Sequence, residues 1–281
     1  MIATTVKVSR PHRPGLPGRQ FASNAAPTAI ALAAGIILWE VVARAWNVIF
    51  FPPFSAVVVR LVELTADGKI LESLAGSLTN LVIGFTISVV FGVGIGMLMG
   101  AYRKVEMALD VYVYAMLTAP SLVFAPIFFA IFGLGRASIL GVVIMYSIFI
   151  IIINTVAAIR TVPIGLIEMG RSYCATERQL FFKIILPAAL PMIFAGLRLG
   201  MGRAVKGTIN GEMFISAVGL GAVVITAGRR FDAAAVLAVL LVIIIVALVA
   251  VKVIQRIDAR LTSWLPSTAR AGKTRRAGGG A

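Results

Sequence analysis

The chain offers few side chains that could carry out nucleophilic, acid–base or metal chemistry. It contains one cysteine, Cys174, and one histidine, His12. These counts exclude an internal disulfide and a Cys/His metal cluster. Ser and Thr are scattered and His12 lies in a basic N-terminal segment, so the apolar segments contain no nucleophile–base pair. No GxxxxGK[ST] motif for binding nucleotide phosphates occurs either. We therefore expect a protein that is not an enzyme, with no catalytic residue, no metal and no cofactor.

Three cations in one apolar segment are the other candidates for chemistry. Arg198, Arg203 and Lys206 interrupt a long run of apolar and glycine residues. Charges within a membrane are costly and usually face the interior of a helix bundle or water. Arg203 and Lys206 are three residues apart and therefore share a helix face. One interpretation is that Arg203, Lys206 and Gly200 line a path that attracts an anionic substrate.

The second interpretation of these cations is structural, and it is the one we favour. Glu212 and Asp110 are the acidic residues that could pair with them. Arg198, near one end of the segment, could instead extend its head group to the inner membrane surface while its stem stays in the apolar region. In this interpretation Glu212 has an architectural role.

The composition indicates that lipid surrounds most of the chain. Hydrophobic residues make up 60% of the 281 residues, only 13% are charged, and the mean hydropathy is +1.00. Soluble domains are closer to half apolar and a quarter charged. The net charge of +15 is concentrated in loops and tails. That distribution favours a membrane-topology signal and argues against a nucleic-acid partner.

Six apolar runs are each long enough to cross a bilayer, which takes roughly 20 helical residues. We predict an all-α polytopic membrane protein with six transmembrane helices. In the second run, Gly96 and Gly100 have the GxxxG spacing that allows close helix packing. Pro120 and Pro126 interrupt the third run and are expected to break its helix. The six runs cover residues 25–46, 77–101, 107–132, 138–159, 188–209 and 233–254.

The positive charges predict which ends of these helices face the cytoplasm. With the N-terminus inside, 17 of the 26 Lys and Arg lie in inner segments and 6 lie in outer segments. An excess of Lys and Arg marks cytoplasmic loops. Both termini are therefore expected in the cytoplasm. The expected domains are a disordered basic tail over 1–24, a transmembrane domain over 25–264 with its core at 77–255, and a second disordered basic tail over 265–281.

The longest inner loop, 160–187, is amphipathic. Apolar residues such as Ile164 and Ile167 can share helix faces, which leaves Arg171 and Glu177 exposed. Such a segment can lie on the membrane surface or project a short helix into a partner. Periodicity alone fits an ordinary connector equally well. Residues 210–231, at the other end, suit either a re-entrant segment or a turn at the outer surface.

The residues of this loop resemble a known motif. EMGRSYCAT followed by IILPAALPMIFAGLRLGMG resembles the cytoplasmic EAA loop of bacterial ABC importer permeases, which reads Glu-Ala-Ala, three residues, Gly, a spacer and Ile-x-Leu-Pro. FPPFSAV near residue 51 and GEMF with GLG near 211–221 are similar to the branch that transports nitrate, sulfonates and taurine. The resemblance covers about residues 30–264. The positions that it assigns to coupling with an ATPase are Glu168, Met169, Gly170, Cys174, Ala175, Leu186 and Pro187.

Cys174 is the main departure from the motif, because it occupies the glycine position. The motif glycine marks the turn between the two short helices of the loop. A positive φ at a residue with a Cβ is costly. We therefore expect either an ordinary φ at Cys174 or a slightly altered loop. A lone cysteine is more often a small packing residue than a catalytic one.

The resemblance implies a type I ABC importer permease of the MetI-like fold in the bacterial inner membrane. It implies two copies of a separate ATPase that receive the loop 160–187 as a coupling helix, a periplasmic solute-binding protein, and a permease homodimer. The implied cargo is a small sulfonate, nitrate or taurine-like anion. The competing class is a transporter driven by an ion gradient, or a channel. That class predicts an intramembrane acidic relay or an inverted repeat; Asp110 is a lone candidate for such a relay, and the sequence shows no repeat.

Overall fold

The computed structural model describes residues 18–46, 48, 50–215 and 218–262, and helices joined by short turns make up nearly all of them. Within those ranges there is no strand. Five helices are long and apolar enough to cross a membrane, and one bent pair of helices can form a sixth span. The predicted all-α membrane fold is therefore confirmed. Residues 1–17 and 265–281, which make up most of the two expected tails, lie outside the described ranges.

The long helices contain the predicted apolar runs and extend beyond most of them. A run of apolar residues marks the part of a helix that lies in lipid. The backbone hydrogen bonds of a helix do not depend on lipid, so the helix continues into polar sequence until a capping or breaking residue ends it. The five long helices are α1 (Gly18–Trp46), α3 (Lys69–Ala101), α6 (Arg136–Arg160), α9 (Leu186–Ile215) and α11 (Ala233–Leu261).

The third predicted span is broken at one proline and not at two. α4 (Arg103–Thr118) ends before Pro120, and a 3₁₀ turn, η1 (Ser121–Phe124), leads into α5 (Ala125–Phe132). The two halves are bent by 95°. The residue before Pro120 is extended, as the proline ring requires. Pro126 lies in the first turn of α5, where its missing N–H costs no hydrogen bond, so the expectation that it interrupts the helix is wrong.

The core is formed where α3, α6 and α9 pack together. α3 contacts α6 through small residues. A Cβ built on Gly96 would lie 2.6 Å from Cβ of Thr155 and 2.9 Å from the carbonyl oxygen of Ile152. A Cβ on Gly100 would lie 2.9 Å from Cβ of Ile159. The GxxxG pair therefore lets the two backbones approach closely, as its spacing predicts.

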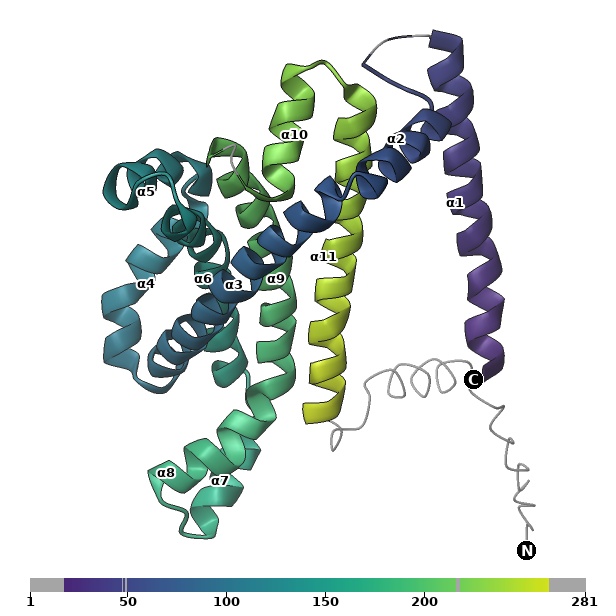
Figure 1. Ribbon diagram of the computed structural model, residues 1–281. Helices are drawn as coiled ribbons and strands as arrows, with labels where there is room; N and C mark the ends of the chain where they lie inside the picture. The colour runs from purple at the N-terminus through teal and green to yellow at the C-terminus, as the bar shows by residue number, and fades with distance from the viewer. Residues whose placement is uncertain (1–17, 47, 49, 216–217, 263–281) are drawn as a thin grey trace, which may run out of the picture.

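Short helices mark the two ends of the molecule (Figure 1). α2 (Phe54–Ala66) and α10 (Gly219–Arg229) lie at one end. α7 (Ile164–Ser172) and α8 (Glu177–Leu180) project from the opposite end. The first turn of α1 and the last turn of α11 lie at the same end as α7 and α8. The helices nearest the two termini thus approach the end that carries the loop 160–187.

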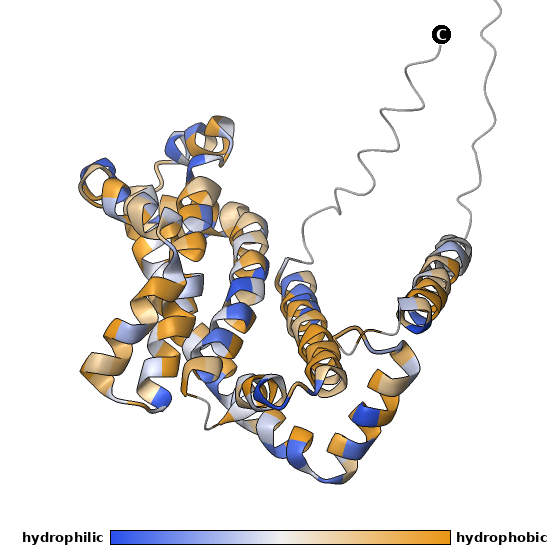
Figure 2. Cartoon of the chain, turned by 90° about the horizontal axis from the view of Figure 1, so that it is seen from above, coloured by the Kyte–Doolittle hydropathy of each residue, from blue (hydrophilic) through white to orange (hydrophobic). Residues whose placement is uncertain are grey.

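The outward faces of the long helices are apolar. Figure 2 shows hydrophobic residues on the outer surfaces of α1 and α11. On α11, Ile245 and Leu248 are more than half exposed. α1 stands apart from the core and is tied to the segment that begins α2, where Trp39 Nε1 donates to the carbonyl oxygen of Pro52 at 3.1 Å. Exposed apolar surface on this scale requires lipid or further protein around the chain.

Candidate functional site

The loop 160–187 forms a helical hairpin. Pro163 precedes α7, and Thr176 starts α8 with a capping box. The amide of Gln179 donates to Oγ1 of Thr176 at 3.3 Å, and the amide of Thr176 donates to Oε1 of Gln179 at 3.0 Å. A π-helical turn, η2 (Phe181–Ile185), continues α8 directly into α9. Because α9 belongs to the core, the hairpin is joined to the core by continuous helix.

Cys174 takes the left-handed conformation at the turn of the hairpin, with φ of 54°. The amide of Ala175 donates to the carbonyl of Gly170 at 3.1 Å, and the amide of Cys174 donates to the carbonyl of Arg171 at 2.9 Å. These two bonds form a Schellman motif with Cys174 in the position that usually holds glycine. Of the two expectations for Cys174, an ordinary φ is therefore wrong. The loop keeps a glycine-type turn although a Cβ is present.

Gly170 joins the two arms of the hairpin. It is buried, and a Cβ built there would lie 2.5 Å from Cδ1 of Ile184 and 2.7 Å from Cδ1 of Leu180. Both neighbouring atoms are the ends of flexible side chains, so a small substituent requires them to shift. The absence of a side chain lets α7 pack closely against α8 and η2. Ala175, which follows the turn, is half-buried, and so are Leu186 and Pro187 in the first turn of α9.

The outer face of the hairpin combines apolar and charged side chains. Tyr173 is 82% exposed, and Met169 and Ile164 are also exposed. Glu168 and Cys174 are exposed beside them. The contact between Arg171 and Glu177 is long, at 3.9 Å, and both side chains are in solvent, so it contributes little. The face is an exposed apolar patch on a firmly attached element, which is suited to docking against another protein.

The cations of α9 are not arranged as the favoured interpretation predicts. Arg203 and Lys206 are exposed, and neither side chain has a hydrogen-bond or ion-pair partner among the described residues. The expectation that they pair with Glu212 or Asp110 is therefore wrong. Arg198 does have an acidic partner, but it is Asp258 of α11, at 3.5 Å.

Gly200 is buried, unlike the two unpaired cations. A Cβ built on Gly200 would lie 2.7 Å from Cγ1 of Ile151, so Gly200 packs against α6. Lys206 is followed on its own face by Asn210, whose Nδ2 donates to the hydroxyl of Tyr146 at 2.8 Å. Arg203, Lys206 and this Asn210–Tyr146 pair form a polar strip on an otherwise apolar bundle.

Glu212 is completely buried and is bound by neutral donors from two other helices. Its carboxylate accepts from Oγ of Ser77 at 2.7 Å, from Nδ2 of Asn80 at 3.1 Å and from the amide of Gly221 at 3.2 Å. It thus links α9 to α3 and to the first turn of α10. The sequence indicates an architectural glutamate, and this is what the structure shows. Its partners Ser77 and Asn80 were not predicted; their only signal is a polar pair, three residues apart, at the start of an apolar run.

Comparison with known proteins agrees with this arrangement. Residues 88–263 match the family described as the binding-protein-dependent transport system inner membrane component. A putative ABC transporter permease of Methanocaldococcus jannaschii is 30% identical over 69% of this chain and 75% of its own length. The putative aliphatic sulfonates transport permease of Bacillus subtilis is 28% identical over 82% and 87%. Further relatives are named for nitrate import, taurine transport and formylaminopyrimidine transport.

Solved structures show the same fold. A structure titled as an inward-facing conformation of the MetNI methionine ABC transporter aligns with 69% of this chain and 96% of its own, with a TM-score of 0.60. The sequence identity in that alignment is 21%. The likeness therefore concerns the arrangement of helices, and it supports the MetI-like type I architecture expected from the loop motif.

Proposed function

Because the chain belongs to the inner membrane components of binding-protein-dependent transport systems, we propose that it is the membrane path of an ATP-driven importer. Permeases of this family work with an ATPase and a solute-binding protein. We assign to this chain two ATPase copies, a second copy of itself and a periplasmic binding protein, assembled in a bacterial inner membrane. Both termini are then cytoplasmic, and the first turn of α1 and the last turn of α11 lie at the same end of the molecule as α7 and α8.

The observation that carries this proposal is the helical hairpin of α7 and α8. Its exposed face contains Glu168, Met169 and Cys174, which we assign to contact with the ATPase. Gly170 is buried beside them against Leu180 and Ile184, and Leu186 packs against the core at the start of α9. Since α8 continues through η2 into α9, a displacement of the hairpin must move α9, which is part of the core. This mechanical connection lets ATP-driven closure of a partner change the packing of the spans.

We assign the path for the solute to the polar strip of α9. Arg203 and Lys206 lie there without an acidic partner in the described part of the chain. A charge in a membrane protein faces water or a bundle interior. Two copies that bring their α9 strips together would enclose four such cations. This arrangement favours a small anion, and relatives named for sulfonates, nitrate and taurine are consistent with that class.

Copurification tests the coupling assignment. The chain, expressed with the ATPase encoded nearest to it, should bring that ATPase down from detergent extracts. Glu168→Arg should weaken the association and abolish solute uptake, because it reverses a charge on the docking face. Asp67→Arg reverses an exposed charge at the opposite end and serves as the matched control. Equal association and uptake for wild type and Glu168→Arg would refute the assignment.

Cys174 gives a second test, because it is the single cysteine of the chain and is exposed. A membrane-impermeant maleimide should leave it unlabelled in spheroplasts and label it in inside-out vesicles. Bound ATPase should protect it in those vesicles. Labelling from the outside would contradict the proposed orientation, and equal labelling with and without the ATPase would contradict the docking face.

A further inference from the structure

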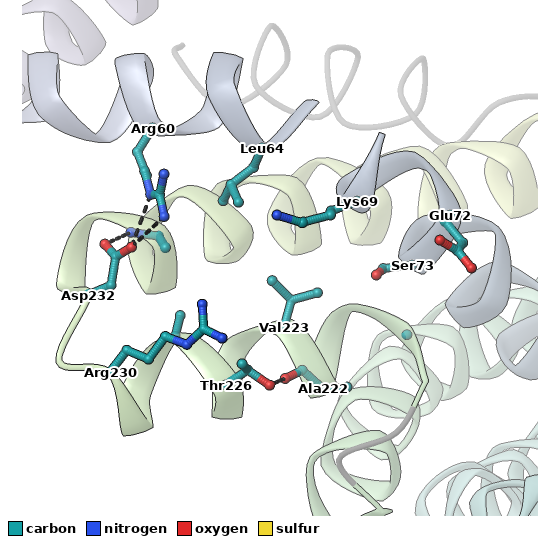
Figure 3. A pocket seen from close by; sticks show the side chains of 13 residues that line it. Arg60, Leu64, Lys69, Glu72, Ser73, Ala222, Val223, Thr226, Arg230 and Asp232 are labelled. Atoms are coloured by element: carbon teal, nitrogen blue, oxygen red, sulfur yellow. Dashed lines mark hydrogen bonds and ion pairs between the residues drawn. The ribbon is translucent and has the colours of Figure 1, made fainter. Parts of the chain in front are cut away.

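A pocket opens at the end of the molecule opposite the hairpin. Its volume is about 360 Å³, which falls in the range of small-molecule sites. It is lined by residues of α2, the start of α3, α10 and the start of α11 (Figure 3). None of the residues assigned above to ATPase coupling or to the α9 strip lines it. The pocket is therefore a separate feature of the structure.

The walls of this pocket are held in place without a ligand. Leu64, Ala227 and Ala235 are buried in one hydrophobic cluster that underlies it. Asp232 accepts from the amide of Ala235 at 2.9 Å and so caps α11. The same carboxylate pairs with Arg60 of α2 at 2.8 Å. These contacts connect α2, α10 and α11, so the cavity is preformed.

Some of the charges around the pocket are already neutralised. Arg60 is bound by Asp232 and, at 2.7 Å, by Glu63. Lys69 pairs with Asp67 at 3.1 Å. These pairs offset part of the positive charge of the two cations.

Two charges of opposite sign remain available. Within the described ranges, the side chains of Arg230 and Glu72 have no hydrogen-bond or ion-pair partner, and neither does the hydroxyl of Ser73. Arg230 extends from the end of α10 into the pocket, and Glu72 and Ser73 stand at its other end on α3 (Figure 3). Val223 and Ala222 lie between the two ends, together with Thr226 and with Lys69, which is paired with Asp67. The pocket thus has a free cation at one end and a free carboxylate at the other.

We infer that this pocket binds a small zwitterion whose anionic group contacts Arg230 and whose ammonium group contacts Glu72 and Ser73. Guanidinium groups bind carboxylate and sulfonate oxygens through charge-assisted hydrogen bonds. A plain anion would leave Glu72 without a partner and repelled, and a plain cation would do the same at Arg230. A short chain of methylene groups would lie against Val223 and Ala222. This inference does not depend on the proposed transport function, because it concerns binding by the isolated chain.

Calorimetry on the purified full-length chain in detergent tests the inference. The probes are β-alanine and taurine, which carry an ammonium group and a carboxylate or a sulfonate. The matched controls are propanoate and ethanesulfonate, which lack the ammonium group, and ethylamine, which lacks the anion. We expect saturable binding of both zwitterions, and each control should bind on the order of tenfold more weakly. Failure of the zwitterions to bind, or equal binding of ethanesulfonate and taurine, would overturn the inference.

Variants identify the site. Arg230→Gln should weaken taurine binding on the order of tenfold, because it removes a charged donor. Glu72→Gln should remove the preference for taurine over ethanesulfonate. Arg229→Gln is the matched control, because Arg229 is the adjacent cation but lines a different hollow. Equal losses in the Arg229 and Arg230 variants would refute the site.

A further pair of variants separates this inference from the proposed path. Arg203 and Lys206 lie outside the pocket, so Arg203→Gln and Lys206→Gln should keep the preference for taurine over ethanesulfonate. Loss of taurine binding in either variant, with Arg230→Gln unaffected, would place the binding site on α9 and refute the pocket. Uptake defects in those variants with an unchanged preference for taurine over ethanesulfonate would support both assignments.

Discussion

Oγ of Ser77 lies 2.7 Å from Oε2 of Glu212 and donates a hydrogen bond to it across the interface of α3 and α9. The same hydroxyl accepts from the amide of Leu220 at 2.8 Å. Gly219, just before it, has φ of 84°, and a Cβ there would collide with the Glu212 carboxylate. One buried carboxylate and one hydroxyl therefore join α3, α9 and the start of α10.

Ser77→Ala should destabilise the protein by about 1–3 kcal/mol, because it leaves the buried amide of Leu220 without its acceptor and removes one of the two donors to Oε2 of Glu212. Thermal unfolding in detergent measures this effect. Thr79→Ala is the control on the same helix, since Thr79 is exposed and bonds only the carbonyl of Ala75. Identical unfolding of the Ser77 and Thr79 variants would show that the network contributes nothing to stability.

Gly96→Ala should destabilise the packing of α3 on α6 by about 1–3 kcal/mol, because the added methyl meets Thr155 and the backbone of Ile152. Gly94→Ala adds the same methyl two residues away, where nothing lies within 4 Å. That variant should be neutral or more stable by about 0.5–1 kcal/mol, since alanine favours helix. Thermal unfolding compares the two variants. If the unfolding temperatures of both change in the same direction, the prediction for Gly96 is wrong.

Cys174→Gly should stabilise the turn of the hairpin by about 1 kcal/mol, because a left-handed residue with a Cβ costs about 1–2 kcal/mol. Hydrogen exchange at the amides of Cys174 and Ala175 reports local opening, and it should slow in the variant. Cys174→Ala keeps a Cβ and should leave exchange near the wild-type rate. Faster exchange in Cys174→Gly would mean that the left-handed turn is not strained.

Arg203→Gln and Lys206→Gln should each lower uptake of an anionic solute on the order of tenfold, because each removes a charge–charge attraction from the proposed path. Uptake of an aliphatic sulfonate into vesicles that contain the assembled transporter measures this loss. Arg136→Gln removes an exposed cation at the start of α6 and should leave uptake unchanged. Unchanged uptake in both α9 variants would refute the assignment of the path.

Arg198 provides a contrast with those two cations. Its pairing with Asp258 connects α9 to α11. Arg198→Gln should therefore lower thermal stability, by up to about 1 kcal/mol for a partly exposed pair. The affinity for an anionic solute should not change.

Much of the fold could be predicted from composition and order along the chain. Apolar runs longer than a bilayer is thick identify membrane helices wherever they lie in space. Pro120 breaks its helix because of its own covalent geometry, and Gly96 and Gly100 mark a contact face by spacing alone. The loop 160–187 could be recognised in the same way, since its motif is continuous in sequence.

The tertiary structure decided which side chains meet. Ser77 and Glu212 are 135 residues apart, and Arg198 and Asp258 belong to different helices, so no local pattern predicts either pair. Whether Arg203 has a partner depends on how α9 is rotated about its axis relative to its neighbours. A rotation by the angle between two successive residues would bring Arg203 against different side chains. The left-handed turn at Cys174 could not be predicted either. A residue with a Cβ prefers a negative φ, but the backbone hydrogen bonds that close the turn hold φ at 54°. The sequence by itself therefore determined the membrane helices and the loop 160–187. Long-range helix packing determined the buried carboxylate network, the unpaired cations and the pocket at the end opposite that loop.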